Sequence, residues 1–177
     1  MSKARHAKRW TYRAATAATF VAAAGAAMFF VITGSATRKV YVHKVRVSGF
    51  LLTTLAALSV VCEKRSVAPT GGTAVTMTAV PLETGFPAAA PTLLQVYTAA
   101  PTEGTLVGTL GIQIVIGKST TVVDGASIDY AEFVFGNSDE TYPVMLNGTE
   151  EGLNLAFGAA PATGVTCVVE VEWSEEA

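Results

Sequence analysis

The chain is poor in the residues that most metal and catalytic sites require. Its 177 residues include two cysteines and two histidines. Cys62 and Cys167 lie far apart without a CxxC spacing, and His6 and His43 form no cluster, so a zinc site is not indicated. We expect both cysteines to be small buried hydrophobes. Whether they are paired with each other is open at this point, because that depends on geometry.

Other chemical signatures are also missing. The glycines lack a following GK[ST] and helix, which argues against a phosphate-binding loop. His43 is flanked by Lys44 and has no nucleophile context, so we expect a surface or partner-facing histidine. Acidic residues gather late in the chain without EF-hand or glycosidase spacing, which favours a solvated loop face. These acids are Asp124, Asp129, Glu132, Asp139 and Glu140. The sequence therefore predicts no enzyme activity, no cofactor, no metal and no small-molecule substrate.

Acidic residues are absent from the first third of the chain. Met1–Cys62 holds nine Lys or Arg and no Asp or Glu, whereas Glu63–Ala177 holds three bases and fourteen acids. The two parts carry +9 and −11, which give the net charge of −2. Such a division is typical of a basic segment that meets an acidic surface or a polyanion. A solvated tail and one exposed strand face would give the same pattern, and charge alone does not separate these readings.

What the chain has in abundance favours short β-strands. Half of its residues are apolar and 15% are charged, and it holds sixteen glycines and seven prolines. The β-branched residues Val and Thr suit a pleated surface, and Gly and Pro supply turns. The length is that of one domain with a real core. No amphipathic helix is indicated after residue 37, and no internal repeat is present.

Alternation of apolar and polar residues predicts about nine or ten strands and an antiparallel β-sandwich, with a jelly roll as a candidate topology. Residues 165–173 alternate most regularly, from Val165 to Trp173, and residues 174–177 should end in solvent. The run TAVTMTAV, residues 73–80, reads as a single strand. A change of phase at His43 and Lys44 indicates a bulge or an edge. One further run predicts a core strand, with one face formed by Leu110, Ile112, Ile114 and Ile116.

Residues 1–26 are interpreted as a basic, Ala-rich arm and residues 27–177 as the sandwich domain. The arm's candidate partner-binding residues are Lys3, Arg5, Lys8, Arg9, Trp10 and Arg13. With Tyr12, they could also neutralise phosphates and stack on bases of a nucleic acid. Protein contact is favoured, because five bases are few and the acidic domain would repel phosphate. Removal of the segment from Met1 to Arg13 should then leave folding intact but weaken assembly.

An export segment is the other interpretation of the N-terminus. Residues 14–37 are uncharged, follow a basic stretch and end in a small-x-small pattern at Gly34–Ala36. The stretch is long enough to span a bilayer, for which about 20 apolar residues suffice. Most of it is Ala, Thr and Gly, however, and only Met28–Ile32 is strongly apolar, which is a strand's length.

Several segments together resemble one group of proteins. They are FFVITGSATRKVYVHKVRVSG, CEKRSVAPTGGTAVTMTAVPLE, VYTAAPTEGTLVGTL, GTEEGLNLAF and VEVEWSEE, in this order between Met28 and Glu176. The chain resembles small β-rich proteins encoded among the structural genes of tailed bacteriophages. The most specific parts are ITGSATRKV, the connection from KRS to TGGT, and the terminal VEW. These signatures describe strands and turns rather than catalytic chemistry.

The resemblance implies a virion structural protein, such as a capsid decoration, collar, head-fibre or tail-associated subunit. It would assemble in the host cytoplasm with copies of itself and with other virion proteins, and FFVITGSAT would be the first strand of the domain. The longer basic extension before that strand departs from the group's pattern. The alternative is a secreted or membrane-anchored adhesion or carbohydrate-binding domain, with residues 1–36 as its signal or anchor.

Overall fold

The computed structural model describes residues 9–17, 19–22, 28–53, 56–119, 129–136, 142–159 and 164–176. All regular elements in these ranges are β-strands, and none is a helix that could cross a membrane. The strands are β1 (Arg9–Ala15), β2 (Phe20–Ala22), β3 (Met28–Thr33), β4 (Lys39–Leu52), β5 (Ala56–Arg65), β6 (Thr73–Thr76), β7 (Thr78–Pro81), β8 (Leu94–Ala99), β9 (Leu106–Ser119), β10 (Tyr130–Val134), β11 (Val144–Leu146), β12 (Gly152–Phe157) and β13 (Val165–Glu176).

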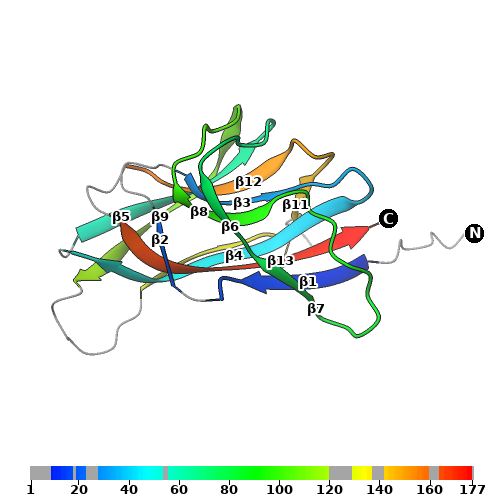
Figure 1. The fold of residues 1–177 in the computed structure, drawn as a ribbon, viewed down its shortest axis with the longest axis horizontal. Helices are drawn as coiled ribbons and strands as arrows, with labels where there is room; N and C mark the ends of the chain where they lie inside the picture. Colours follow the sequence, from blue (N-terminus) through cyan, green and yellow to red (C-terminus); the bar gives the residue numbers. More distant parts are fainter. Residues whose placement is uncertain are drawn as a thin grey trace, which may run out of the picture.

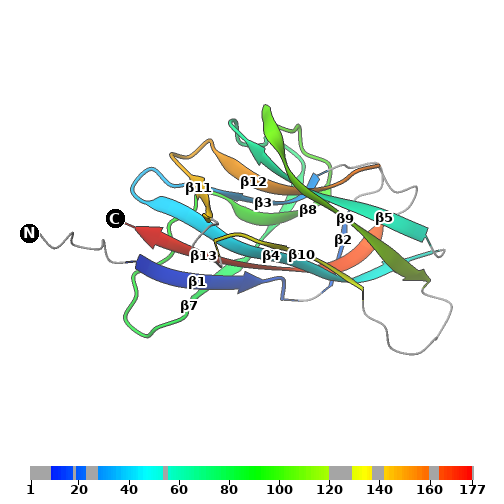
Figure 2. The ribbon, with the colours of Figure 1, turned by 180° about the vertical axis from the view of Figure 1, so that it is seen from behind.

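The strands form two antiparallel sheets packed face to face, so the predicted antiparallel β-sandwich is confirmed (Figure 1). Sheet A has the order β4-β13-β1-β7, with β10 and β11 also pairing with β4, and β2 pairing with β13. Sheet B has the order β6-β8-β3-β12-β5-β9. Seen from behind, β10 and β9 lie on the near side of the sandwich (Figure 2). One short parallel pairing, Leu51–Leu52 with Lys118–Ser119, joins β4 to β9.

The core lies between the sheets and is made by the inward faces of their long strands. On β13 every second residue from Val165 to Trp173 is buried, as the alternation predicts. On sheet B, Phe29 of β3 stacks on Phe157 of β12 with ring centroids 4.4 Å apart. Burial of such aliphatic and aromatic side chains is the main force that holds two sheets together.

A β-bulge interrupts the pairing of β4 with β13 where the sequence indicates a change of phase. Glu172 lies opposite Lys44, but the next residue, Trp173, lies opposite Val42, so His43 is the extra residue. A bulge lets β4 keep apolar residues in the core on both sides of His43 although the alternation slips by one position. The prediction of a bulge at this point is therefore confirmed.

The run at residues 73–80 is two strands rather than one. β6 pairs with β8 in sheet B, and β7 pairs with β1 in sheet A. The chain crosses between the sheets at Met77, whose side chain is buried and whose amide donates to the carbonyl of Leu94 over 2.9 Å. The alternation of apolar and polar residues predicts which residues share a face. It does not predict the change of sheet, because the period of two continues unchanged from β6 into β7.

The N-terminal boundary of the sandwich differs from the predicted domain boundary at residue 26. β1 lies between β13 and β7, and its register places Arg9 opposite Glu176 and Ala15 opposite Glu170. Tyr12 and Ala14 of β1 are buried in the core. The part of the predicted arm from Arg9 to Ala15 is therefore a central strand of sheet A, while residues 1–8 lie outside the described residues.

Candidate interaction surfaces

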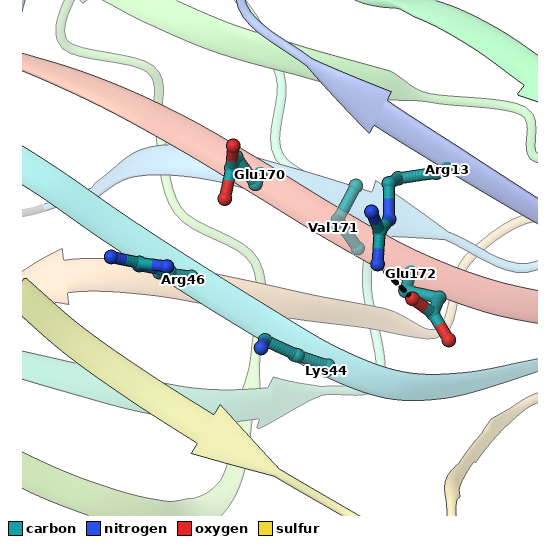
Figure 3. A pocket seen from close by; sticks show the side chains of 6 residues that line it. All are labelled: Arg13, Lys44, Arg46, Glu170, Val171 and Glu172. Atoms are coloured by element: carbon teal, nitrogen blue, oxygen red, sulfur yellow. Dashed lines mark hydrogen bonds and ion pairs between the residues drawn. The ribbon is translucent and has the colours of Figure 1, made fainter.

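The outer face of sheet A carries charges of alternating sign across neighbouring strands. Arg13 of β1, Glu170 and Glu172 of β13, and Lys44 and Arg46 of β4 line a shallow pocket (Figure 3). Their order follows from the register, in which Glu172 lies opposite both Arg13 and Lys44, and Glu170 lies opposite Arg46. Because β13 directs its apolar residues inward, its glutamates point to the surface.

Ion pairs link these strands in a row. Arg13 Nη2 lies 2.7 Å from Glu172 Oε2, and Lys44 Nζ lies 2.5 Å from Glu132 Oε1 on β10. All four side chains remain partly exposed, so each pair contributes about 0–1 kcal/mol. Opposite charges on facing positions chiefly favour this strand register over others.

Arg46 is held differently from its neighbours. Its guanidinium carbon lies 4.4 Å from the centroid of the Tyr130 ring, a cation-π contact. Its Nε atom is buried and has no hydrogen-bond partner within the described part of the chain. The charged face of sheet A therefore contains one unsatisfied hydrogen-bond donor, the Nε atom of Arg46.

The predicted partner-binding residues fall into two sets. Lys3, Arg5 and Lys8 lie outside the described residues. Arg9 pairs with Glu176 over 3.6 Å and has its guanidinium 4.5 Å from the Tyr41 ring centroid, and Arg13 pairs with Glu172 as described above. Arg9 and Arg13 are therefore engaged within sheet A, although both remain partly exposed.

The two aromatic residues of β1 are unsuited to stacking on nucleic-acid bases. Tyr12 is buried, stacks on Trp173, and donates from its hydroxyl to the carbonyl of Pro87 over 2.9 Å. Trp10 is partly buried against the core, and the Arg38 guanidinium covers its ring at 4.8 Å. Both rings therefore have partners inside the sandwich.

A buried carboxylate at the end of β13 contradicts the prediction that residues 174–177 end in solvent. Glu175 is fully buried. Its oxygens accept hydrogen bonds from Trp173 Nε1 at 3.0 Å, from the Ala90 amide at 2.8 Å and from Arg38 Nη1 at 2.9 Å. Arg38 also donates to the Ala88 carbonyl. These bonds fix the loop after β7 onto sheet A, a role that no sequence pattern indicates.

His43 forms a hydrogen bond with a serine, yet the pair does not make a catalytic dyad. Its Nε2 lies 2.8 Å from Ser174 Oγ. Burial, and to a lesser degree Arg9, lowers the pKa of His43, while Glu172 acts in the opposite direction. Ser174 is only 2% exposed, and no carboxylate of the described chain is hydrogen-bonded to the other ring nitrogen. A nucleophile needs access to substrate and an oriented base, and this pair offers neither.

The exposed stripe on β9 contradicts the prediction that this face belongs to the core. The exposed fractions are 42% for Leu110, 61% for Ile112, 76% for Ile114 and 53% for Ile116. The stripe lies on the outer face of sheet B, and the intervening residues face the sandwich interior. Single exposed aliphatic residues are common, but a row of four on one strand forms a contiguous apolar patch.

The inward face of β9 rests on β10 through small and polar residues. A Cβ atom on Gly111 would lie 3.1 Å from the Phe133 ring, so the glycine makes room for that side chain. The Gln113 amide accepts from the Glu132 backbone amide at 2.9 Å and donates to its carbonyl at 2.6 Å. The Gln113 side chain thereby hydrogen-bonds the backbone N–H and C=O of Glu132 on β10 without using the backbone groups of β9.

A groove beside the stripe ends in a buried ion cluster. Its apolar part includes Val61, Ile112 and Phe157. At its polar end, Arg65 is buried and pairs with both Glu63 and Glu103. Sequence reasoning missed this cluster, because Glu103 lies in the loop before β9. That loop is far along the chain from Glu63 and Arg65 of β5.

The remaining candidates lack the geometry of a reactive site. Cys62 and Cys167 are both free and buried, and burial raises the pKa of each thiol, to about 12 for Cys167. Asp129 accepts from the Ile116 amide at 2.9 Å, while Asp124, Asp139 and Glu140 lie outside the described residues. Within the described ranges, no three His, Cys, Asp or Glu side chains gather as metal ligands would.

Comparison of the chain with protein families, with curated proteins and with solved structures found no match.

Proposed function

We propose that this chain is a non-enzymatic structural protein of a tailed-phage virion. It would act as a capsid decoration, collar or tail-associated subunit, and it would assemble in the host cytoplasm through contacts with copies of itself and with other virion proteins. Its mechanism is mechanical. A sandwich that binds the assembled shell and not its separate parts stabilises the assembly by mass action.

The exposed aliphatic row on β9 is the observation that carries this proposal. Ile112, Ile114 and Ile116 are each more than half exposed, although the chain has a full core between its sheets. Burial of apolar surface against a partner contributes about 25 cal/mol per Å². An exposed apolar row that is stabilised by burial against another protein is suited to a structural subunit.

The use of polar residues gives a second support. Ser174 holds His43, Glu63 and Glu103 hold Arg65, and Glu175 is held by three donors. These side chains, which most resemble catalytic groups, are engaged in fixing strands and loops. That arrangement favours a protein that must be rigid over one that must exchange protons with a substrate.

The segments that carry the resemblance to tailed-phage structural proteins form the body of the sandwich. FFVITGSAT begins in β3, which lies between β8 and β12 with all six residues buried. The terminal VEW lies in β13, which pairs with β4 and β1. The resemblance therefore rests on segments that determine the fold.

Export with residues 1–36 as a cleaved signal is the less favoured reading. Cleavage after Ala36 would remove β1, β2 and β3, and with β3 the strand that joins β8 to β12. Buried strands are poor candidates for removal, because their loss would expose the aromatic core. Binding of nucleic acid is also less favoured, since Trp10 and Tyr12 have partners within the fold.

The experiment that tests the proposal is intact-mass measurement of the protein from its native source. Purified particles and the cell-envelope fraction are compared. The uncut chain in particles is the expected result. A chain that begins at Thr37 and is found in the envelope or outside the cell would overturn the virion proposal and favour the exported adhesion or carbohydrate-binding domain.

A further inference from the structure

Among the described residues, no strand pairs with the edge of β9 that faces away from β5 between Gly111 and Gly117. β9 pairs with β5 without a register shift from Gly111 to Gly117. On its other edge, the only described pairing is the two-residue contact of Lys118–Ser119 with β4. A long strand at the edge of a sheet presents unpaired N–H and C=O groups that another strand can use.

The direction of these backbone groups follows from one hydrogen bond. The amide of Ile116 donates to the Asp129 carboxylate, so it points away from β5. In an antiparallel ladder, alternate residues direct both backbone groups to the same side. Ile112 and Ile114 therefore direct their N–H and C=O groups to the open edge. The same residues carry the most exposed side chains of the stripe.

Apart from the Asp129 carboxylate on the Ile116 amide, this edge has little of the usual protection against pairing. Natural edge strands often carry Lys, Pro or inward charges, or are very short. Leu106–Gly117 contains no charged residue and no proline. By contrast, the edge strand β6 has four residues, and the edge strand β7 ends at Pro81. Bulges near Leu110 and Val107 interrupt only the first half of β9.

We propose that β9 pairs antiparallel with β9 of a second copy of this chain across a two-fold axis. Identical strands can pair in this way because each offers the other the same open edge, which makes the contact isologous. With Gln113 at the axis, Ile112 lies opposite the partner subunit's Ile114, and sheet B continues from one copy into the next. Residues on the outer face then meet outer-face residues, so the two stripes merge.

Charge and area both bear on the choice of a second copy. The uncharged part of β9, Leu106–Gly117, meets no like charge on itself when it pairs with its own copy, whereas the outer face of sheet A carries charged side chains. The regular part, Gly111–Gly117, gives a contact about 20 Å long at about 3.3 Å per residue. These seven residues are far fewer than the roughly 20–30 residues per partner of a standard interface, so the dimer should be concentration-dependent. Repeated contacts in a particle would strengthen it.

The test is sedimentation velocity of the full chain over a wide range of concentration. The native protein should shift from monomer to dimer as concentration rises. Ile114→Lys should remain monomeric, because it places a charge opposite apolar residues and the partner's identical lysine nearby. Val80→Lys is the matched control, since Val80 is 55% exposed on the edge strand β7 and its replacement should leave the dimer intact.

Amide hydrogen exchange separates edge pairing from contact between outer faces. The amides of Ile112 and Ile114 should exchange slowly in concentrated protein and rapidly in dilute protein or in Ile114→Lys. A native chain that stays monomeric throughout would overturn the inference. A dimer that survives Ile114→Lys, or one whose Ile112 and Ile114 amides stay unprotected, would do so as well. Equal melting temperatures for the variants and the native chain show that folding is not the cause.

This inference rests on the proposed function, which it extends by naming one interface. The two can fail separately. A chain that is monomeric in solution yet present uncut in particles would overturn the β9 pairing and leave the virion proposal standing. A chain that forms the β9 dimer but is absent from particles would overturn the virion proposal alone.

Discussion

The phenol ring of Tyr12 stacks on the indole of Trp173, with centroids 5.6 Å apart and ring planes inclined by 21°. Both side chains are fully buried. The two residues are directly opposite each other in the pairing of β1 with β13, near the two ends of the described chain. The contact explains why a basic, arm-like segment is a strand of the core.

Replacement of Trp173 by Ala should destabilise the protein strongly. The change removes the stacking with Tyr12 and the hydrogen bond to Glu175, and it leaves a cavity in the core. We expect a loss of about 3–5 kcal/mol in the free energy of unfolding, measured with urea. Trp10→Ala is the matched control and should cost less, because Trp10 is only partly buried. Equal effects of the two changes would contradict this account of the core.

Loss of the carboxylate of Glu175 should cost far more than loss of an exposed one. Glu175→Gln leaves Arg38, whose side chain is 20% exposed, without its ionic partner. Breaking a buried pair in this way typically costs about 3–5 kcal/mol. Glu172→Gln, which breaks the exposed pair with Arg13, should cost about 0–1 kcal/mol. Urea unfolding of both variants measures the difference, and similar values would show that Glu175 has solvent access.

Two truncations should differ in their effect on stability. Deletion of residues 1–8 removes no described strand and should leave the melting temperature unchanged. Deletion of residues 1–13 removes most of β1, including Tyr12, and should lower the melting temperature or prevent folding. Circular dichroism on heating distinguishes these outcomes. If both truncated chains melt like the full chain, β1 contributes little to the fold, as expected for a free arm.

The two cysteines should be inert in the folded protein. Burial raises the pKa of both thiols, that of Cys167 to about 12, so almost no thiolate exists near neutral pH. Labelling with a thiol reagent should therefore be slow in the native state and complete in urea, with two labels per chain. Rapid labelling of either cysteine without denaturant would place that residue at the surface.

The contrast between β13 and β9 shows what alternation can predict. On β13 the outward positions hold glutamates such as Glu170 and Glu172, so the sequence itself indicates which face is exposed to solvent. From Leu106 to Gly117 neither face of β9 is charged, and Gly111 and Gln113 are atypical of a core. They face inward because Phe133 fills the space beside Gly111 and because Gln113 bonds to the backbone of β10. Those contacts join residues about twenty positions apart and have no local signal.

β1 was open to prediction, whereas the contacts of the buried Glu175 carboxylate were not. Trp10, Tyr12 and Ala14 alternate with polar or small residues at period two, which is a strand pattern in spite of the basic charges. The partners of Glu175 lie at Arg38 and Ala90, far along the chain. Only the folding of the whole chain brings these residues together, so the local sequence around each of them does not predict the contact.

The stability of the protein should fall as the pH drops below about 6.5, in part through His43. Burial lowers the pKa of this histidine below its ordinary value of 6.5, with Arg9 acting in the same direction and Glu172 against it. Between the two pKa values the unfolded chain binds more protons than the folded one, so the free energy of unfolding rises with pH through this window and levels off above it. His43→Gln should remove this part of the slope. Urea unfolding of the native chain and the variant between pH 5 and about pH 8 measures the difference. A difference between the two proteins that does not change with pH would show that His43 titrates alike in the folded and unfolded states.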